Sequence, residues 1–207
     1  MKTLVLTASP RRKGNTNSLT DFFCTELTDY DRVNLYDLQI EPCLACRKCQ
    51  ADWEKPACAR SDDLQGRSCA QMEGLFDRIL SAELIVLATP VYSWYCTAPM
   101  KALLDRCVYA LNKYYGVPEK DGSGENRRGP SLWAGKRMAL IATCGYKPEK
   151  GADLLVEGLK RYCKHSQLEY AGALIERHMG YESEFMDKDK EERAKEFARS
   201  LMEAEDD

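Results

Sequence analysis

The cysteines of this chain include a set with the spacing of a metal or cluster site. Cys43, Cys46 and Cys49 stand three residues apart, and Cys58 follows after eight intervening residues. Thiols at CxxCxxC spacing can reach one metal centre, and a fourth cysteine can complete the ligands of an iron–sulfur cluster. The same set could hold zinc or remain as reduced thiols. The spacing therefore leaves open a cluster, a zinc site or free thiols.

A second candidate segment, at 9–18, reads SPRRKGNTNS and joins a predicted strand to a predicted helix. The first turn of a helix carries free N–H groups and the positive end of the helix dipole, so it can bind an anion. The segment lacks the glycine spacing of the common mononucleotide and dinucleotide loops. The helix start and the short polar side chains of this segment instead predict a site for a phosphate monoester. The alternative is an ordinary polar loop with a helix cap.

A third segment, at 89–101, reads TPVYSWYCTAPMK and follows the continuous apolar run ELIVLAT. Its three aromatic residues fall within four positions after a strand, and they cannot all be core residues. Aromatic faces and backbone N–H groups together suit a planar heterocycle. The alternative is a hydrophobic flap or a contact between subunits.

Apolar patterns predict the elements that position these segments, all within one domain at 1–207. Five strands alternate with about five helices, which is typical of a parallel sheet covered by helices on both faces. Ligands of such sheets bind at the carboxyl ends of the strands. The strands are predicted at 2–8, 31–36, 83–89, 136–143 and 168–174. The helices are predicted at 15–28, 72–80, after Thr97, 153–165 and 190–202. A cysteine-rich connection spans 41–69, and a mobile loop is predicted at 117–131.

The composition narrows the class of protein. The chain has 207 residues, of which 44% are hydrophobic and 30% charged, so it is not a disordered chain. A net charge of -3 argues against a dedicated nucleic-acid binder. No apolar run approaches the length of a membrane helix. We therefore expect a cytoplasmic protein without membrane or nucleic-acid partners, in which the ten cysteines do not form a disulfide framework.

Three motifs carry a family resemblance. The pattern S-P-R-x-x-G-N-T at 9–16, T-P-V-Y at 89–92 and A-P-M-K-A-L-L-D-R at 98–106 resemble the NADPH-dependent FMN reductase and iron–sulfur flavoprotein group. The resemblance covers roughly residues 1–110, with a weaker similarity at 143–146. It implies a flavodoxin-like α/β/α sandwich with a five-stranded parallel sheet of order 2-1-3-4-5.

The resemblance also implies FMN, a reduced nicotinamide as co-substrate, and a [4Fe–4S] cluster on Cys43, Cys46, Cys49 and Cys58. The spacing to Cys58 is longer than in most such proteins, so zinc and reduced thiols stay open as alternatives to the cluster. A homodimer or homotetramer is expected. By motif position, the FMN contacts are Ser9, Arg11, Asn15, Thr16, Asn17, Ser18, Pro90, Val91, Tyr92, Ser93, Trp94, Thr143, Gly145 and Tyr146.

Three functions fit these features. The first is an NAD(P)H oxidoreductase that passes electrons through FMN to a small-molecule or protein acceptor, with no catalytic side chain of its own because the flavin carries the chemistry. The second is an FMN and [4Fe–4S] electron carrier between proteins. The third is a cofactor-free regulatory domain with thiols or a bound metal.

Overall fold

The computed structural model describes residues 1–50, 67–113, 131–178 and 185–203. Most of the cysteine-rich connection predicted at 41–69, including Cys58, lies outside these residues. The loop predicted at 117–131 lies outside them too, apart from its last residue.

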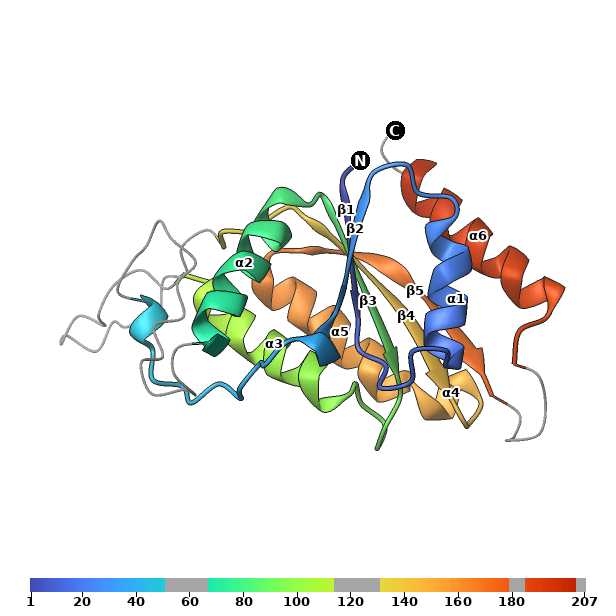
Figure 1. The fold of residues 1–207 in the computed structure, drawn as a ribbon, viewed down its shortest axis with the longest axis horizontal. Coiled ribbons are helices and arrows are strands. Elements are labelled where there is room, and N and C mark those ends of the chain that lie inside the picture. Colours follow the sequence, from blue (N-terminus) through green and yellow to red (C-terminus); the bar gives the residue numbers. More distant parts are fainter. Residues whose placement is uncertain (51–66, 114–130, 179–184, 204–207) are drawn as a thin grey trace.

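Five parallel strands form one sheet in the order β2-β1-β3-β4-β5. The central strands are apolar and almost fully buried, as expected where helices cover both faces of a parallel sheet. All five strands end at the same edge of the sheet, toward the bottom of Figure 1. This confirms the predicted fold class and strand order. The strands are β1 (Thr3–Thr7), β2 (Tyr30–Asn34), β3 (Leu84–Pro90), β4 (Arg137–Cys144) and β5 (Glu169–Arg177).

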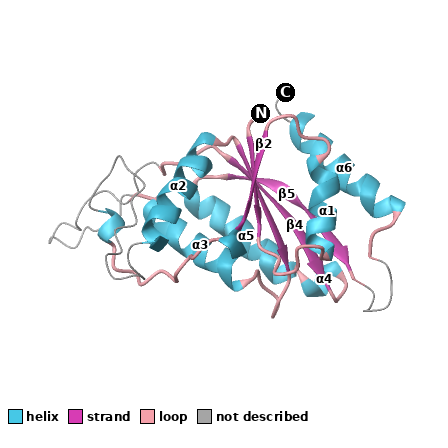
Figure 2. Ribbon diagram, in the orientation of Figure 1, coloured by secondary structure: helices cyan, strands magenta, loops and turns pink. Residues whose placement is uncertain are grey.

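The helices pack in two layers, one on each face of the sheet, as Figure 2 also shows. Helices α1 and α6 cover one face, and α2, α3 and α5 cover the other. The α-helices are α1 (Asn15–Cys24), α2 (Arg67–Ser81), α3 (Ala98–Ala110), α4 (Pro148–Gly151), α5 (Asp153–Ser166) and α6 (Lys188–Glu203). Two 3₁₀ helices, η1 (Leu35–Asp37) and η2 (Lys48–Gln50), complete the described elements.

Each layer buries its own apolar cluster. Leu19 and Phe23 of α1 meet Ala194 and Ala198 of α6 over one face of the sheet. The larger cluster on the other face surrounds the fully buried side chain of Trp133. Apolar residues at helical spacing in α1 and α6 thus pack as the sequence predicts. No helix of the described residues is long and apolar enough to cross a membrane.

Several predicted element ends differ from the structure, and a local hydrogen bond explains one of them. Strand β2 ends at Asn34, whose side chain accepts the amide of Tyr36 at 2.9 Å and begins η1. Thr97 occupies the N-cap position of α3, as predicted, but its hydroxyl donates to the carbonyl of Ala8 at 2.9 Å instead of accepting a helix amide. Helix α2 begins at Arg67 rather than 72, so the end of the predicted connection is helical. Helix α1 stops at Cys24 rather than 28, and the short α4 was not predicted.

Candidate functional site

The loops after β1, β3 and β4 are joined to one another at the carboxyl edge of the sheet. The hydroxyl groups of Thr16 and Thr143 are 2.7 Å apart. The amide of Val91 donates to the carbonyl of Thr143 at 2.8 Å. Together with the bond from Thr97 to Ala8, these contacts bring the predicted segments at 9–18, 89–101 and 143–146 into one site.

The loop after β1 is a tight turn that Gly14 permits. Its amide donates to the carbonyl of Arg11 at 3.0 Å. A Cβ atom on Gly14 would lie 2.8 Å from the Cβ of Arg11, which is closer than two carbon atoms can pack. The side-chain amide of Asn17 donates to the carbonyls of Arg11 and Arg12 at 2.8 and 3.2 Å. Asn17 is buried, so it braces the turn from inside.

The N-terminus of α1 is left with free donors. Gly14 is the N-cap residue and offers no side-chain acceptor. Within the described residues, the backbone amides of Asn15, Thr16 and Asn17 have no acceptor. The exposed side chain of Arg11 forms no ion pair with any described residue. This arrangement fits a phosphate group, since phosphate accepts amide hydrogen bonds at the positive end of a helix.

Arg12, next to Arg11, has a different role, which the sequence did not indicate. Its guanidinium pairs with Asp37 of η1, and this hydrogen bond lowers the pKa of the Asp37 carboxyl. Arg32 of β2 donates to the side-chain oxygen of Asn17 at 3.2 Å and pairs with Asp21 at 2.5 Å. The two arginines and their two aspartate partners line a polar cleft beside the turn, and their charges sum to zero.

The loop after β3 is a hairpin with the twist of a type I′ turn. Tyr92 and Tyr95 exchange backbone hydrogen bonds of 2.9 and 3.0 Å. Ser93 and Trp94 between them have φ values of 50° and 62°, in the left-handed region that few residues other than glycine adopt. Such strain is common at functional sites, where the surrounding structure maintains it.

Aromatic side chains project from this hairpin and from the loop after β4. Trp94 stacks on Tyr146, with ring centroids 6.1 Å apart and an interplanar angle of 11°. The indole N–H of Trp94 donates to the carbonyl of Lys150 at 3.1 Å. The two side chains are still 49% and 63% exposed. They form a flat aromatic surface that can accept a planar ligand.

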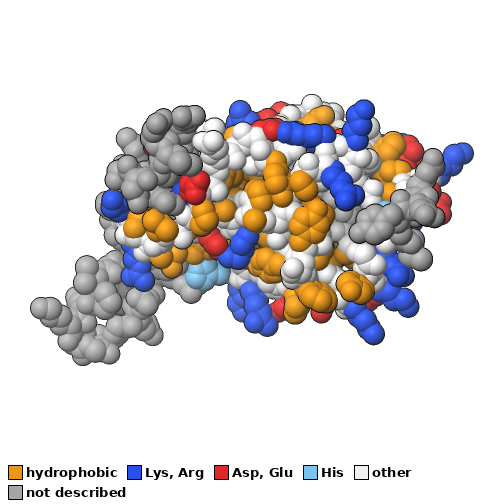
Figure 3. Space-filling model, turned by 60° about the horizontal axis from the view of Figure 1, so that its bottom comes forward, with side chains coloured by type: hydrophobic (Ala, Val, Ile, Leu, Met, Phe, Trp, Pro, Cys, Tyr) orange, Lys and Arg blue, Asp and Glu red, His pale blue; other side chains and the backbone are white. Residues whose placement is uncertain are grey.

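Exposed hydrophobic side chains gather at this edge of the sheet, which Figure 3 turns toward the reader among lysines and arginines. Tyr36 belongs to this group but was not predicted as a site residue. Its side chain is 41% exposed. Burial, with a contribution from neighbouring Tyr92, raises its pKa. Only the packing of β2 beside β1 reveals it, because Tyr36 is far from the other site residues in sequence.

The predicted FMN contacts fall into three classes of exposure. The exposed residues form the rim, and the buried residues support the loops from below. Exposed are Arg11, Tyr92, Ser93, Trp94, Gly145 and Tyr146; half-buried are Asn15, Ser18, Pro90 and Val91; buried are Ser9, Thr16, Asn17 and Thr143.

The cysteine segment has one feature of a thiolate site. The amide of Ala45 donates to the Sγ of Cys43 at 3.4 Å, and Ala45 has a φ of 52°. Amide donors to sulfur stabilise a ligating thiolate. The described part of the chain does not gather three potential metal ligands, however, and Cys49 is buried in the core. The described residues therefore do not form a complete cluster site, and Cys58 lies outside them.

Helix α3 and the residues directly after it hold the cysteine segment in place. The buried guanidinium of Arg106 donates to the carbonyl of Glu41 at 2.6 Å. The buried ammonium of Lys113 donates to the carbonyl of Cys49 at 2.8 Å. Gln50 adds a hydrogen bond of 3.0 Å to the carbonyl of Asn112. The segment is thus fixed at one end to α3 and at the other to the residues that follow this helix. The other cysteines whose side chains are described, Cys24, Cys96, Cys107, Cys144 and Cys163, are all buried.

Sequence relatives support the resemblance predicted from the motifs. An iron–sulfur flavoprotein of Archaeoglobus fulgidus is 30% identical over 110 residues, which cover 51% of this chain and 45% of the relative. An iron–sulfur flavoprotein of Methanosarcina thermophila is 29% identical over 93 residues, covering 45% of this chain and 43% of the relative. The chain thus spans about half the length of the curated relatives it matches.

Solved structures share the fold across almost the whole chain. An FMN-dependent NADH-azoreductase of Bacillus anthracis, in complex with FMN, has a TM-score of 0.67 at 17% identity, with 98% of each chain covered. An NAD(P)H:quinone oxidoreductase of Methanothermobacter marburgensis has a TM-score of 0.66 at 17% identity, with 97% of this chain and 98% of the other covered. The model of the flavodoxin-like fold family matches residues 1–204. With this match and its sheet order, the chain belongs to the flavodoxin-like family.

Proposed function

We propose that this protein is an FMN-dependent oxidoreductase that takes electrons from NADH or NADPH. One arrangement carries the proposal: the free N-terminus of α1 and the aromatic hairpin lie at one edge of the sheet. They are linked through β4, by the hydrogen bonds of Thr143 to Thr16 and Val91. A phosphate site next to a flat aromatic surface suits a flavin mononucleotide. The reductases that share the fold, whose names include FMN and NAD(P)H, support the same assignment.

The chain supplies binding and orientation. The amides of Asn15, Thr16 and Asn17, with Arg11, would hold the phosphate group. The hairpin and Tyr146 would border the ring system, and the buried pair Thr16 and Thr143 would keep the two ends of the site in register. FMN itself would supply the redox chemistry when bound. The predicted contacts also include Ser9, Ser18, Pro90, Val91, Ser93 and Gly145.

The electron acceptor in this proposal is a small molecule or another protein. The exposed aromatic surface of Trp94 and Tyr146 favours a planar small molecule. We further propose a homo-oligomer in the cytoplasm, with no nucleic-acid or membrane partner, as the sequence predicts.

The second candidate is an electron carrier that combines FMN with a [4Fe–4S] cluster on Cys43, Cys46, Cys49 and Cys58. The amide bond from Ala45 to the Cys43 sulfur favours it, as do the names of the iron–sulfur flavoproteins. Because the described cysteines are not gathered, no step of the proposed reaction depends on the cluster.

Anaerobic purification followed by a visible spectrum tests both candidates. The oxidoreductase predicts the two visible bands of bound FMN, which bleach when NADH or NADPH is added. The electron carrier predicts a broad additional absorption, with iron and sulfide, that Cys43→Ser and Cys46→Ser abolish while FMN remains. Bound FMN that neither nicotinamide reduces would contradict the oxidoreductase.

A colourless protein that cannot be reconstituted with FMN would contradict both candidates. It would leave the third function that the sequence allows, a cofactor-free regulatory domain.

A further inference from the structure

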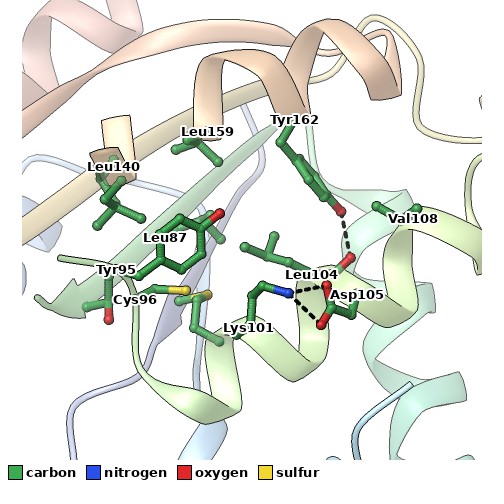
Figure 4. Close-up of a pocket in the computed structure, with 13 residues that line it drawn as sticks. Leu87, Tyr95, Cys96, Lys101, Leu104, Asp105, Val108, Leu140, Leu159 and Tyr162 are labelled. Carbon is green, nitrogen blue, oxygen red and sulfur yellow. Dashed lines mark hydrogen bonds and ion pairs between the residues drawn. The ribbon is translucent and has the colours of Figure 1, made fainter. Parts of the chain in front are cut away.

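A cavity of about 170 Å³ lies between α3 and α5 (Figure 4). Its floor is formed by Leu87 of β3 and Leu140 of β4. Leu104 of α3 and Leu159 of α5 form opposite walls. One end is closed by Tyr95, which extends from the hairpin after β3. None of the described residues that line this cavity belongs to the predicted FMN contacts.

The polar groups around the cavity are mostly paired within the protein. Lys101 and Asp105 form an ion pair with distances of 2.6 and 2.7 Å. The hydroxyl of Tyr162 donates to the carbonyl of Leu104 at 3.1 Å. Burial raises the pKa of the Cys96 thiol to about 11, so this thiol is neutral at physiological pH. The cavity is therefore apolar and carries no net charge.

Tyr95 is the polar residue of the cavity that is not paired within the described residues. Its hydroxyl has no hydrogen-bond partner among the described residues, and its ring lies against α5 where Gly158 leaves room. Figure 4 shows the ring reaching across the cavity from the hairpin toward Leu159. A ligand in the cavity would thus meet apolar side chains on most sides and, at one end, the Tyr95 hydroxyl, which has no partner among the described residues.

The volume and lining together define a class of ligand. An engineered apolar cavity of about 150 Å³ in another protein binds benzene, so this cavity is large enough for one aromatic ring. We propose that the cavity between α3 and α5 binds a neutral, single-ring aromatic molecule of the phenol class. The ring occupies the space between Leu87, Leu104 and Leu159, and the phenolic hydroxyl pairs with that of Tyr95.

The cavity borders the hairpin after β3, which carries part of the candidate flavin site. Tyr95 exchanges two backbone hydrogen bonds with Tyr92, so a ligand against the Tyr95 ring contacts the same hairpin that carries Trp94. The cavity is nonetheless a separate site, and its occupation does not depend on whether FMN binds.

Calorimetric titration of the purified protein with phenol tests the proposal, with and without saturating FMN. We expect saturable binding of one phenol per chain under both conditions. Leu155→Phe, which fills the cavity, should weaken phenol binding by roughly tenfold or more. Leu154→Phe makes the same change on the preceding residue, whose side chain is 59% exposed and does not line the cavity. This control should leave phenol binding unchanged.

Tyr95→Phe should weaken phenol binding while leaving benzene binding intact, because only phenol uses the hydroxyl group. If Leu155→Phe does not fold, Val108→Phe on the opposite wall fills the same space. Unsaturable binding, equal affinity in a folded cavity-filling variant, or displacement of phenol by FMN would overturn the proposal.

A second copy of the chain is the rival occupant. A wild-type dimer that excludes phenol, and that dissociates in the Leu155→Phe variant, would show that a subunit contact covers the cavity. That result would overturn the proposal. If FMN does not bind at all, the proposed function fails, but phenol binding still tests the proposal for the cavity.

Discussion

Tyr95 packs so closely against Gly158 that a Cβ atom at position 158 would lie 3.1 Å from the Tyr95 hydroxyl oxygen. The same atom would lie 3.2 Å from Cε2 of the ring. Glycine in the middle of a helix costs stability, yet here it lets the aromatic hairpin rest on α5. The position of the hairpin is thus set partly by a helix more than sixty residues away in sequence.

Replacing this glycine should separate helix propensity from packing. Gly158→Ala gains helix propensity but pushes the Tyr95 ring, so we expect little net change in the free energy of unfolding. Gly74→Ala in α2 meets no atom within 4 Å and should stabilise the protein by about 0.5–1 kcal/mol. Urea unfolding of both variants measures the difference.

The double variant Gly158→Ala with Tyr95→Ala isolates the contact. In the Tyr95→Ala background, Gly158→Ala should stabilise the protein about as much as Gly74→Ala does. Equal stabilisation by Gly158→Ala with Tyr95 present would show that the ring moves aside without cost.

The two neighbouring arginines should differ in their effect on FMN binding. Arg11 has no described ion-pair partner, whereas Arg12 is paired with Asp37. Arg11→Ala should weaken FMN binding by about tenfold, because a charged contact with the phosphate is lost. Arg12→Ala should have a smaller effect. Flavin fluorescence titrations with FMN and with riboflavin, which lacks the phosphate, measure both.

Riboflavin serves as the internal control, since its affinity should be the same in the wild type and in Arg11→Ala. An equal loss for both flavins would place the phosphate elsewhere.

Asn112 should be important for stability. Its side-chain oxygen accepts hydrogen bonds from Ser131 at 2.8 Å and from the indole of Trp133 at 2.9 Å, and its amide donates to Ser166 at 3.0 Å. Asn112→Ala leaves these buried groups without partners and should lower the free energy of unfolding by about 3 kcal/mol. Chemical denaturation measures the loss.

Asn34→Ala is the matched control for Asn112→Ala. It removes one hydrogen bond, to the amide of Tyr36 in a turn, and should cost about 1 kcal/mol or less. A similar loss in both variants would mean that the groups around Asn112 find other partners or water.

The buried thiols predict a loss of stability in alkaline solution. Burial raises the pKa of Cys163 from 9.0 to about 12. Between these values the unfolded chain releases the thiol proton and the folded chain keeps it, so rising pH favours unfolding. The stabilising effect is complete below pH 9 and is lost as the pH rises toward 12. Cys163→Ala should therefore flatten the decline by up to about 1.4 kcal/mol per pH unit.

Urea unfolding at several pH values from 7.5 to 10.5 measures this decline in the wild type and in the variant. The variant is expected to be less stable at neutral pH because it leaves a small cavity. The prediction is therefore tested by the change of the free energy of unfolding with pH, not by its absolute value. Parallel slopes would show that Cys163 is deprotonated as easily in the folded chain as in the unfolded one.

The sequence predicted the elements of the site better than their contacts. The apolar run before Thr89 and the polar turn at 9–18 were enough to identify two of the loops and the edge of the sheet where they meet. The role of Thr97 was not predictable in the same way. It stands at the N-cap of α3 as its position predicts, but its hydroxyl bonds to Ala8, which is distant in sequence.

The amino-acid sequence was enough to predict the fold, the strand order through the family motifs, and the residue types at the site. Alternation of apolar segments and the chemistry of a helix N-terminus are local properties, so they can be read along the chain. The folded structure was needed to show that Arg12, and not Arg11, has an ion-pair partner among the described residues, that Tyr36 joins the site, and that Gly158 supports Tyr95. Each of these depends on distances between residues far apart in sequence, and packing alone fixes such distances.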